Sequence, residues 1–288
     1  MNIYGISDLH LSGIPPFKPM THFGPQYTGH IEKLEAGFKA LPPDSVVINA
    51  GDISWAIDRE EALTDLKWLN SFGVKIVNTR GNHDFFWGNK GAPFMTNWAL
   101  DNGLDNLYFV DHTALFHIGG PKHFITVAAV KGSEKMEQYE IEFDPNKLPP
   151  GHKPKSVVIT PKHWNKHQRK LEAALALKPD ILVSHIPPFD LGGVENEWTR
   201  LVYGSGVGMV LFGHWHNAAP NKFDHTVVQD VLFHNLLCER HDFAPIRIGQ
   251  VDEERGVKQL WGLDAIGGIV LEVRAPLSPD FIHTDGMI

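Results

Sequence analysis

The sequence has almost no cysteine and no hydrophobic run long enough to cross a bilayer. Cys238 is the single cysteine in 288 residues, so an intrachain disulfide framework is excluded. The first residues, MNIYGISDLHLS, enter an apolar stretch without the basic segment that precedes the core of a signal peptide. We therefore expect a soluble, cytoplasmic protein with no membrane-spanning segment.

The chain also lacks an excess of positive charge. It carries 26 Lys and Arg against 34 Asp and Glu, which gives a formal net charge of −8. This balance provides no general attraction to nucleic acids or anionic membranes. A hydrophobic content of 42% is ordinary for a chain that buries a core, and no internal repeat or low-complexity tract is present.

Short apolar runs that end in polar or glycine-rich junctions recur along the chain and have the composition of buried strands. They lie at residues 2–7, 45–50, 74–78, 124–130, 180–184 and 208–212. Helical patterns fall between them, at about residues 30–40, 59–71 and 163–177. Asp58 and Glu61 have the spacing of a capping box at the start of the second helix. This alternation favours an α/β layered fold.

Two regions depart from the alternation. Residues 131–156 are charged and rich in proline, which predicts a long excursion between core elements. Beyond about residue 225, the stretches TVVQDVLFHNL and GGIVLEV alternate in polarity and predict further strands, with antiparallel pairing favoured.

Side chains that bind metals follow five of the predicted strands. In chain order they are Asp8 and His10, then Asp52, then Asn82 with His83, then His185, and finally His214 with His216. In extended backbone, residues two apart point to the same face, so each of the pairs 8/10 and 214/216 is expected to share one. Ligands in open α/β sheets gather at the carboxyl ends of strands, which predicts a common site for the whole set.

Each of these residues also has an ordinary structural role. Asp8, Asp52 and Asn82 are common turn and cap residues, and His185 has the character of a satisfied core histidine. His214 and His216 are two of 17 histidines. The joint occurrence of such residues at five strand ends nevertheless favours a metal site over coincidence.

A site with two metal ions would use all of these side chains at the strand ends. Two divalent ions about 3.5 to 4 Å apart need a bridging anion, and Asp52 is the expected bridge. Imidazole and carboxylate ligands suit Mn, Fe or Zn better than Mg or Ca. Because Asn82 is neutral, the loaded site keeps a net positive charge, which attracts phosphate and makes hydroxide available from bound water as the nucleophile.

The stretch GNHD at residues 81–84 carries further chemistry next to the Asn82 ligand. His83 is adjacent to Asn82 but points elsewhere, so we expect it to donate a proton or a hydrogen bond to the departing ester oxygen. Asp84 is expected to orient the His83 imidazole and to stabilise its charge. A turn at these residues is compatible with both roles.

The pieces DLH, GD, GNHD, SH and GHWH, in this order, resemble the signature of the calcineurin-like metallophosphoesterases. The resemblance implies a four-layer αββα sandwich, here a single domain over residues 1–288. It also implies one metal ion held by Asp8, His10, Asp52 and His216, a second held by Asp52, Asn82, His185 and His214, and His83 as the acid. No ligand is missing. The surroundings GDISWA and GNHDFFW are similar to a bacterial group of predicted phosphohydrolases.

We therefore expect a dinuclear hydrolase of a small phosphate monoester or diester, which attacks phosphorus with metal-bound hydroxide. One alternative is a nuclease, which needs a basic track with aromatic residues that the acidic balance does not favour. Another is a non-catalytic interaction scaffold, against which the intact ligand set argues. The sequence identifies neither the physiological substrate nor the oligomeric state.

Two segments and three aromatic residues are candidates for the substrate pocket. Residues 131–156 and 186–208 follow strands near the expected site and are candidate pocket walls. Phe85, Trp87 and Trp215 have the rings to stack on a substrate, with ordinary packing as the alternative.

Overall fold

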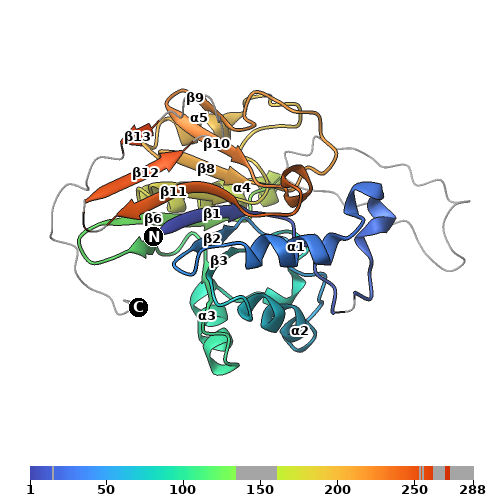
Figure 1. Cartoon of the computed structure of the whole chain (residues 1–288). Helices are drawn as coiled ribbons and strands as arrows, with labels where there is room; N and C mark the ends of the chain where they lie inside the picture. Colours follow the sequence, from blue (N-terminus) through green and yellow to red (C-terminus); the bar gives the residue numbers. More distant parts are fainter. Residues whose placement is uncertain (15, 134–160, 253, 255, 262–269, 273–288) are drawn as a thin grey trace, which may run out of the picture.

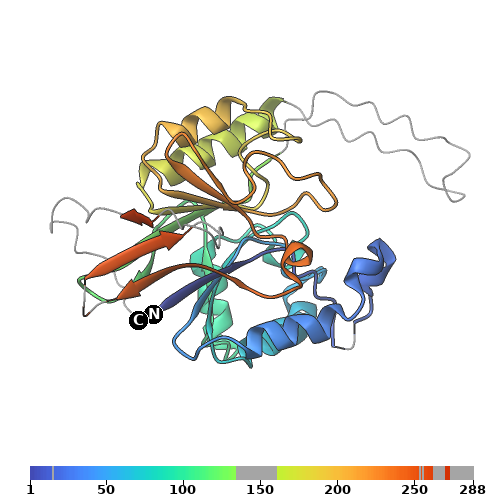
Figure 2. The same cartoon turned by 45° about the horizontal axis from the view of Figure 1, so that its top comes forward.

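The computed structural model describes residues 1–14, 16–133, 161–252, 254, 256–261 and 270–272. Two β-sheets lie face to face, and helices cover the outer side of each sheet (Figures 1 and 2). These are the four layers of the predicted αββα sandwich, so the predicted fold class is confirmed. The single domain over residues 1–288 stays a prediction.

The first sheet contains β1 (Asn2–Ile6), β2 (Val46–Asn49), β3 (Lys75–Thr79), β4 (Leu107–Val110), β11 (Ile246–Asp252), β12 (Val257–Trp261) and β13 (Val270–Glu272). Their order across the sheet is β13-β12-β11-β1-β2-β3-β4. Strands β1 to β4 are parallel, so their carboxyl ends lie on one edge, whereas β11, β12 and β13 pair antiparallel.

The second sheet contains β5 (Phe116–Gly119), β6 (Phe124–Val130), β7 (Ile181–Ser184), β8 (Met209–Phe212), β9 (Thr226–Val228) and β10 (Val231–Asn235). Their order is β5-β6-β7-β8-β10-β9. The four inner strands are parallel, and the edge strands β5 and β9 are antiparallel to their neighbours. The stretch TVVQDVLFHNL thus forms the predicted antiparallel pair, β9 and β10.

Three helices cover the first sheet, α1 (His30–Lys39), α2 (Arg59–Asn70) and α3 (Ala92–Asp101), and two cover the second, α4 (Pro161–Ala176) and α5 (Glu197–Tyr203). Short 3-10 helices are η1 (Met20–Phe23), η2 (Pro25–Tyr27), η3 (Phe85–Trp87) and η5 (Cys238–His241). At the start of α2, the Asp58 carboxylate accepts the backbone N–H groups of Glu60 and Glu61. The Glu61 carboxylate accepts the N–H of Ile57 instead of that of Asp58, so half of the predicted capping box forms.

Alternating side chains of the central strands divide the core into three layers. In β2, Val47 packs under α1 and α2, whereas Val46 and Ile48 pack between the sheets. In β6, Val127 and Ala129 also lie between the sheets, and the intervening residues of β6 pack under α4 with Leu171 and Ala174. Because both faces of these strands are buried, their sequences read as continuous apolar runs.

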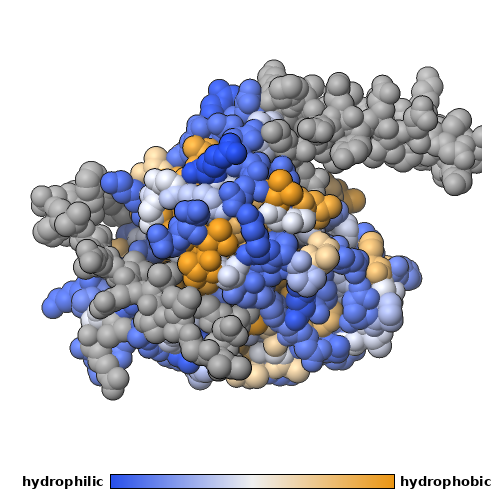
Figure 3. Space-filling model, turned by 90° about the horizontal axis from the view of Figure 1, so that it is seen from above, coloured by the Kyte–Doolittle hydropathy of each residue, from blue (hydrophilic) through white to orange (hydrophobic). Residues whose placement is uncertain are grey.

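The six predicted strands correspond to β1, β2, β3, β6, β7 and β8, and the three predicted helices to α1, α2 and α4. Most of the excursion predicted at residues 131–156 lies outside the described residues. In the described part of the chain, no helix combines the length and apolar character needed to span a bilayer. Seen from above, the described surface is largely hydrophilic, with small separate hydrophobic patches (Figure 3).

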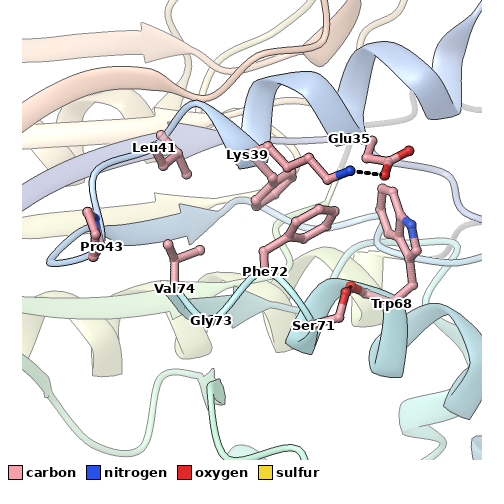
Figure 4. A pocket seen from close by; sticks show the side chains of 10 residues that line it. Glu35, Lys39, Leu41, Pro43, Trp68, Ser71, Phe72, Gly73 and Val74 are labelled. Carbon is pink, nitrogen blue, oxygen red and sulfur yellow. Dashed lines mark hydrogen bonds and ion pairs between the residues drawn. The ribbon is translucent and has the colours of Figure 1, made fainter.

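A hollow between the end of α1 and the turn from α2 to β3 is lined by Trp68, Phe72 and Val74 (Figure 4). An ion pair between Lys39 and Glu35 lies at its edge. None of the predicted site residues lines this hollow. This hollow is therefore separate from the predicted metal site.

Candidate metal centre

The predicted ligands lie just beyond the strands, on backbone that is not extended. Strand β1 ends at Ile6, and Asp8 and His10 have φ angles of 61° and 47°. Asp52 after β2 and His214 after β8 have φ angles of 53° and 76°. Such left-handed values are uncommon for residues other than glycine and cluster at functional sites. The sequence-based reason given for the pairing of residues two apart, an extended backbone, is therefore wrong for these loops.

Glycines let these loops approach each other closely. A Cβ on Gly213 would lie 2.1 Å from the Asp8 Oδ2 atom, and one on Gly81 would lie 2.0 Å from Asp52 Oδ1. The loops are also joined by backbone hydrogen bonds, from Asp8 N to Gly51 O at 2.9 Å and from His10 N to Asp52 O at 3.0 Å. The glycine in each of GD, GN and GH thus belongs to the architecture of the site.

Asp8, His10 and His216 form one group with the geometry to hold a metal ion. The Nε2 atoms of His10 and His216 are 3.0 Å apart. Asp8 Oδ1 lies 3.7 Å from the first of these atoms and 3.2 Å from the second. Residues from the ends of β1 and β8, which belong to different sheets, therefore converge on one point.

Asp52, His185 and His214 form a second group of the same kind. His185 Nε2 lies 3.4 Å from Asp52 Oδ2 and 2.8 Å from the Asn82 Oδ1 atom. The same Asp52 Oδ2 atom is 3.8 Å from His10 Nε2, in the first group. Asp52 therefore lies between the two groups, and His214 and His216 belong to different groups, so they do not share a face as predicted.

The residues present fit divalent metal ions. Asp8 Oδ1 is fully buried without a hydrogen-bond donor among the described residues, although two imidazoles face it. A buried carboxylate oxygen in this position needs a cation or a proton donor. The mixed imidazole and carboxylate donors match transition-metal ions.

The electrostatics of the two groups are strongly coupled. Burial opposes the charge of Asp8 and of Asp52, but the facing histidines outweigh it and lower both pKa values, that of Asp52 to about 2. Burial also opposes the charge of His185 and His216, yet the nearby carboxylates raise their pKa values to about 9 and about 10. The carboxylates and these two imidazoles thus stabilise each other's charged forms.

Another imidazole borders the site without joining either group. The backbone N–H of His83 donates to Asp52 Oδ1 at 2.8 Å, which fixes the loop. Its ring lies 4.1 Å from the Trp55 ring and 5.5 Å from the His10 ring, between centroids. Burial lowers the pKa of His83, against the effect of Asp52. Its side chain is thus available for a role other than metal binding.

Asp84 has partners other than the predicted one. Its buried carboxylate accepts the backbone N–H groups of Gly81, Asp52, Ile53 and Ser54 at 2.7 to 3.3 Å. Among the described residues it makes no hydrogen bond with the His83 imidazole, so the predicted orienting contact is not formed. Burial and the facing Asp52 raise the pKa of Asp84 to about 7, against the effect of the N–H donors. Asp84 instead joins the loops after β2 and β3.

Three further residues position ligands and were missed by the sequence analysis. The Nδ1 atom of His216 lies 2.7 Å from the Glu239 carboxylate and 2.9 Å from the Tyr27 hydroxyl. The Ser7 hydroxyl donates to Asp8 Oδ2 at 2.5 Å. Ser7 adjoins a ligand in the sequence, but Glu239 arrives after β10, where the chain crosses to Ser7, and carries no local signal.

The three aromatic residues predicted as candidates for stacking on a substrate differ in their exposure. Trp87 is 1% exposed and packs against Phe109, so it cannot stack on a substrate. Phe85 is 53% exposed and lies edge-on to His83. Trp215 is half-buried and lies edge-on to Phe189. Phe85 is the candidate with an open ring beside the site.

The candidate wall at residues 186–208 is only partly available for that role. It contains α5, whose Trp198 and Val202 pack against the outer face of the second sheet. This face of α5 is therefore not available to a substrate, and a pocket wall formed by residues 186–208 stays a prediction.

The family model described as calcineurin-like phosphoesterase matches residues 1–218. The chain belongs to this family. Family membership implies phosphoester hydrolase activity that depends on metal ions, and all nine predicted site residues lie within the matched segment.

A search of curated proteins finds no match. Among solved structures, the chain is similar to a protein of unknown function, AQ665, from Aquifex aeolicus, at 14% identity and a TM-score of 0.41, with 85% of this chain and 95% of that chain covered. It is also similar to the phosphopantetheinyl hydrolase PptH from Mycobacterium tuberculosis, at 15% identity and a TM-score of 0.49, with 86% and 95% covered.

Proposed function

We propose that the protein is a dinuclear metal-dependent phosphoesterase that hydrolyses a small phosphate monoester or diester. The observation that carries this proposal is the pair of adjacent ligand groups that meet at Asp52. One group alone is compatible with a structural ion. Two groups that share a carboxylate fit a pair of ions acting on one phosphate.

The ligands divide between the two ions as follows. Asp8, His10 and His216 would hold one ion, and Asn82, His185 and His214 would hold the other, with Asp52 shared. His185 donates its Nδ1 proton to the Ala50 carbonyl at 3.0 Å, which leaves Nε2 free to ligate. When bound, the ions would lower the pKa of a water molecule and neutralise charge on the phosphoryl oxygens. Manganese, iron and zinc fit these donors.

The remaining residues act on the substrate or on the loops. His83 would protonate the departing oxygen, because its ring borders the ligands without being bound to them. Asp84 would act as a positioning residue, since its carboxylate fastens the Asp52 loop to the Gly81 loop. The neutral Asn82 side chain leaves the site more attractive to a phosphate than a carboxylate would.

Two alternatives have less support. A nuclease would need a basic track for the strand, and the chain carries a net charge of −8. Salt-sensitive binding of single strands at physiological ionic strength would favour it. A non-catalytic scaffold would not need a complete ligand set.

The cytoplasmic location stays a prediction from the sequence.

Replacement of Asp52 tests the proposal. Asp52→Asn removes the shared charge, so we expect turnover of 4-nitrophenyl phosphate with excess manganese to fall at least about a hundredfold. Elemental analysis of the dialysed variant should show less bound metal than the wild type. The control is Asp44→Asn, an exposed carboxylate that borders neither ligand group.

Two results would contradict the proposal. Unchanged turnover in Asp52→Asn would remove the shared carboxylate from the mechanism. A wild-type chain that holds less than about one transition metal after reconstitution would favour the scaffold.

A further inference from the structure

A short loop after the first ligands fixes the position of a lysine. The Ser12 hydroxyl donates to the Lys18 carbonyl at 3.0 Å and accepts the Lys18 N–H at 3.1 Å. The Phe17 N–H donates to the Ser12 carbonyl at 2.8 Å. Ser12 is buried and lies two residues after His10, so the backbone of Lys18 is tied to the metal-ligand segment.

The ammonium group of Lys18 lies against two parallel aromatic rings. The Trp55 and Phe23 rings are stacked, with centroids 6.1 Å apart and planes at 4°. The Lys18 Nζ atom lies 3.0 Å from the Trp55 centroid and 5.2 Å from the Phe23 centroid. Cation–π attraction of this kind holds the side chain in a defined place without neutralising its charge.

The same indole connects the lysine to the metal centre. The Trp55 ring stacks on the His10 ring, with centroids 4.8 Å apart, and contacts the His83 ring at 4.1 Å. Lys18 and His83 therefore both contact Trp55. Two exposed rings lie beside them: Phe23, 47% exposed, stacks on Trp55, and Phe85, 53% exposed, lies edge-on to His83.

The charge of Lys18 has no acidic partner in the part of the chain that the structure describes. No carboxylate there lies within ion-pair distance of its ammonium group, although the chain has more acidic than basic residues. Next to a centre built to hold two dications, a further positive charge is repelled. The Trp55 and Phe23 rings hold this ammonium group in place but supply no negative charge to neutralise it.

We propose that Lys18 binds a second anionic group of the substrate, on the leaving-group side of the scissile phosphate. This inference rests on the proposed function, because His83 as the acid defines that side. The substrate class is then a phosphate ester or anhydride that carries another phosphate or a carboxylate beyond the scissile bond. Such a leaving group would extend past the exposed rings of Phe23 and Phe85, which contact Trp55 and His83.

Binding of two phosphonates to manganese-loaded protein tests the role of Lys18 without catalysis. Methylphosphonate offers one anionic group, and methylenediphosphonate offers two. In the wild type we expect tighter binding of methylenediphosphonate by isothermal titration calorimetry. In Lys18→Met its affinity should fall about tenfold, while that of methylphosphonate should change less than about threefold. Chelation of the ions contributes equally in both proteins, so it cancels in this comparison.

The controls separate charge from structure. Lys18→Arg keeps the charge and should keep most of the preference for the diphosphonate. Lys90→Met removes a lysine that lies 4.6 Å from the Phe94 centroid, and it should leave both affinities unchanged. Lys18→Gln replaces the methionine variant if the latter does not fold. Elemental analysis should show the same metal content in all of these proteins.

The outcomes distinguish the two proposals. If the wild type binds both phosphonates but Lys18→Met weakens them equally or not at all, the role of Lys18 is refuted and the proposed function stands. If metal-loaded wild type binds neither phosphonate, both proposals fail.

Discussion

The orientation of the His216 side chain, a ligand in the proposed metal site, is set by residues outside the proposed ligand set. Its Nδ1 atom donates to the Glu239 carboxylate, so its Nε2 atom faces Asp8. His216 itself is 26% exposed, whereas Glu239 is 8% exposed. A carboxylate behind a ligating imidazole fixes the tautomer and raises its basicity as a ligand.

Glu239→Gln should therefore weaken the binding of the ion near Asp8. We expect the affinity for manganese to fall about 10- to 100-fold, since such supporting partners commonly contribute this much. Titration of the metal-free protein measures it. Glu195→Gln, which breaks an exposed ion pair with Lys222, is the matched control and should bind metal as the wild type does. Equal affinities in both variants would show that Glu239 does not support the ligand.

Among the secondary-structure elements, the junction after β8 leaves no space for a side chain at its first residue. The strand ends at Phe212, and the next residue, Gly213, passes directly over the end of β1. A Cβ at this position would lie 2.1 Å from Asp8 Oδ2 and 2.2 Å from Ser7 Oγ. Both neighbours are fully buried, so neither has room to move away.

Gly213→Ala should for this reason separate β8 from β1 at the metal centre. We expect loss of bound metal and of phosphatase activity together with a lower melting temperature. The control is Gly204→Ala at the end of α5, where the nearest atom would be 3.6 Å from the new Cβ. Elemental analysis and thermal melts compare the two. If Gly213→Ala kept full metal content, the close packing of these loops would not be needed for the site.

For the molecule as a whole, a buried histidine connects the two sheets. His234 on β10 is fully buried and donates from Nε2 to the Trp261 carbonyl on β12 at 2.7 Å. Its Nδ1 atom lies 3.0 Å from His225 Nδ1. Burial is the main cause that lowers the pKa of His234 to about 4, and the hydrogen bond to Trp261 opposes the shift. The folded protein thus keeps this imidazole neutral.

Acid should consequently reduce the stability of the fold through His234. Its pKa is lower in the folded chain than the usual value of 6.5, so below pH 6.5 only the unfolded chain takes up the proton. The contribution of His234 to the free energy of unfolding then falls by about 1.4 kcal/mol per pH unit between pH 6.5 and about 4, and above pH 6.5 this contribution is constant.

Urea unfolding of the chelator-treated protein between pH 6.5 and 5 measures this slope. His234→Gln should be less stable at neutral pH and should depend less steeply on pH, by about one proton. His22→Gln, at an exposed position, is the control and should keep the wild-type slope. Parallel slopes in His234→Gln and the wild type would contradict the account.

Much of the fold was predictable because its central strands are buried on both faces. Strands such as β2 and β6 appear as uninterrupted apolar runs, since their side chains alternate between two core layers. The gathering of the candidate ligands was predictable for a related reason. Polar residues that follow buried parallel strands lie together at one edge of the sheet. Strands β4, β5, β11 and β12 and helices α3 and α5 gave weaker patterns and were not predicted.

The sequence by itself determined the set of candidate ligands, because strand ends and ligand types are local features. The tertiary structure alone decided how they meet: the left-handed backbone at Asp8 and Asp52, the four N–H groups on Asp84, and the arrival of Glu239 behind His216. It also placed Lys18 on Trp55. The physical reason is that these contacts join residues far apart in the chain, and their energies depend on distances that no local pattern encodes.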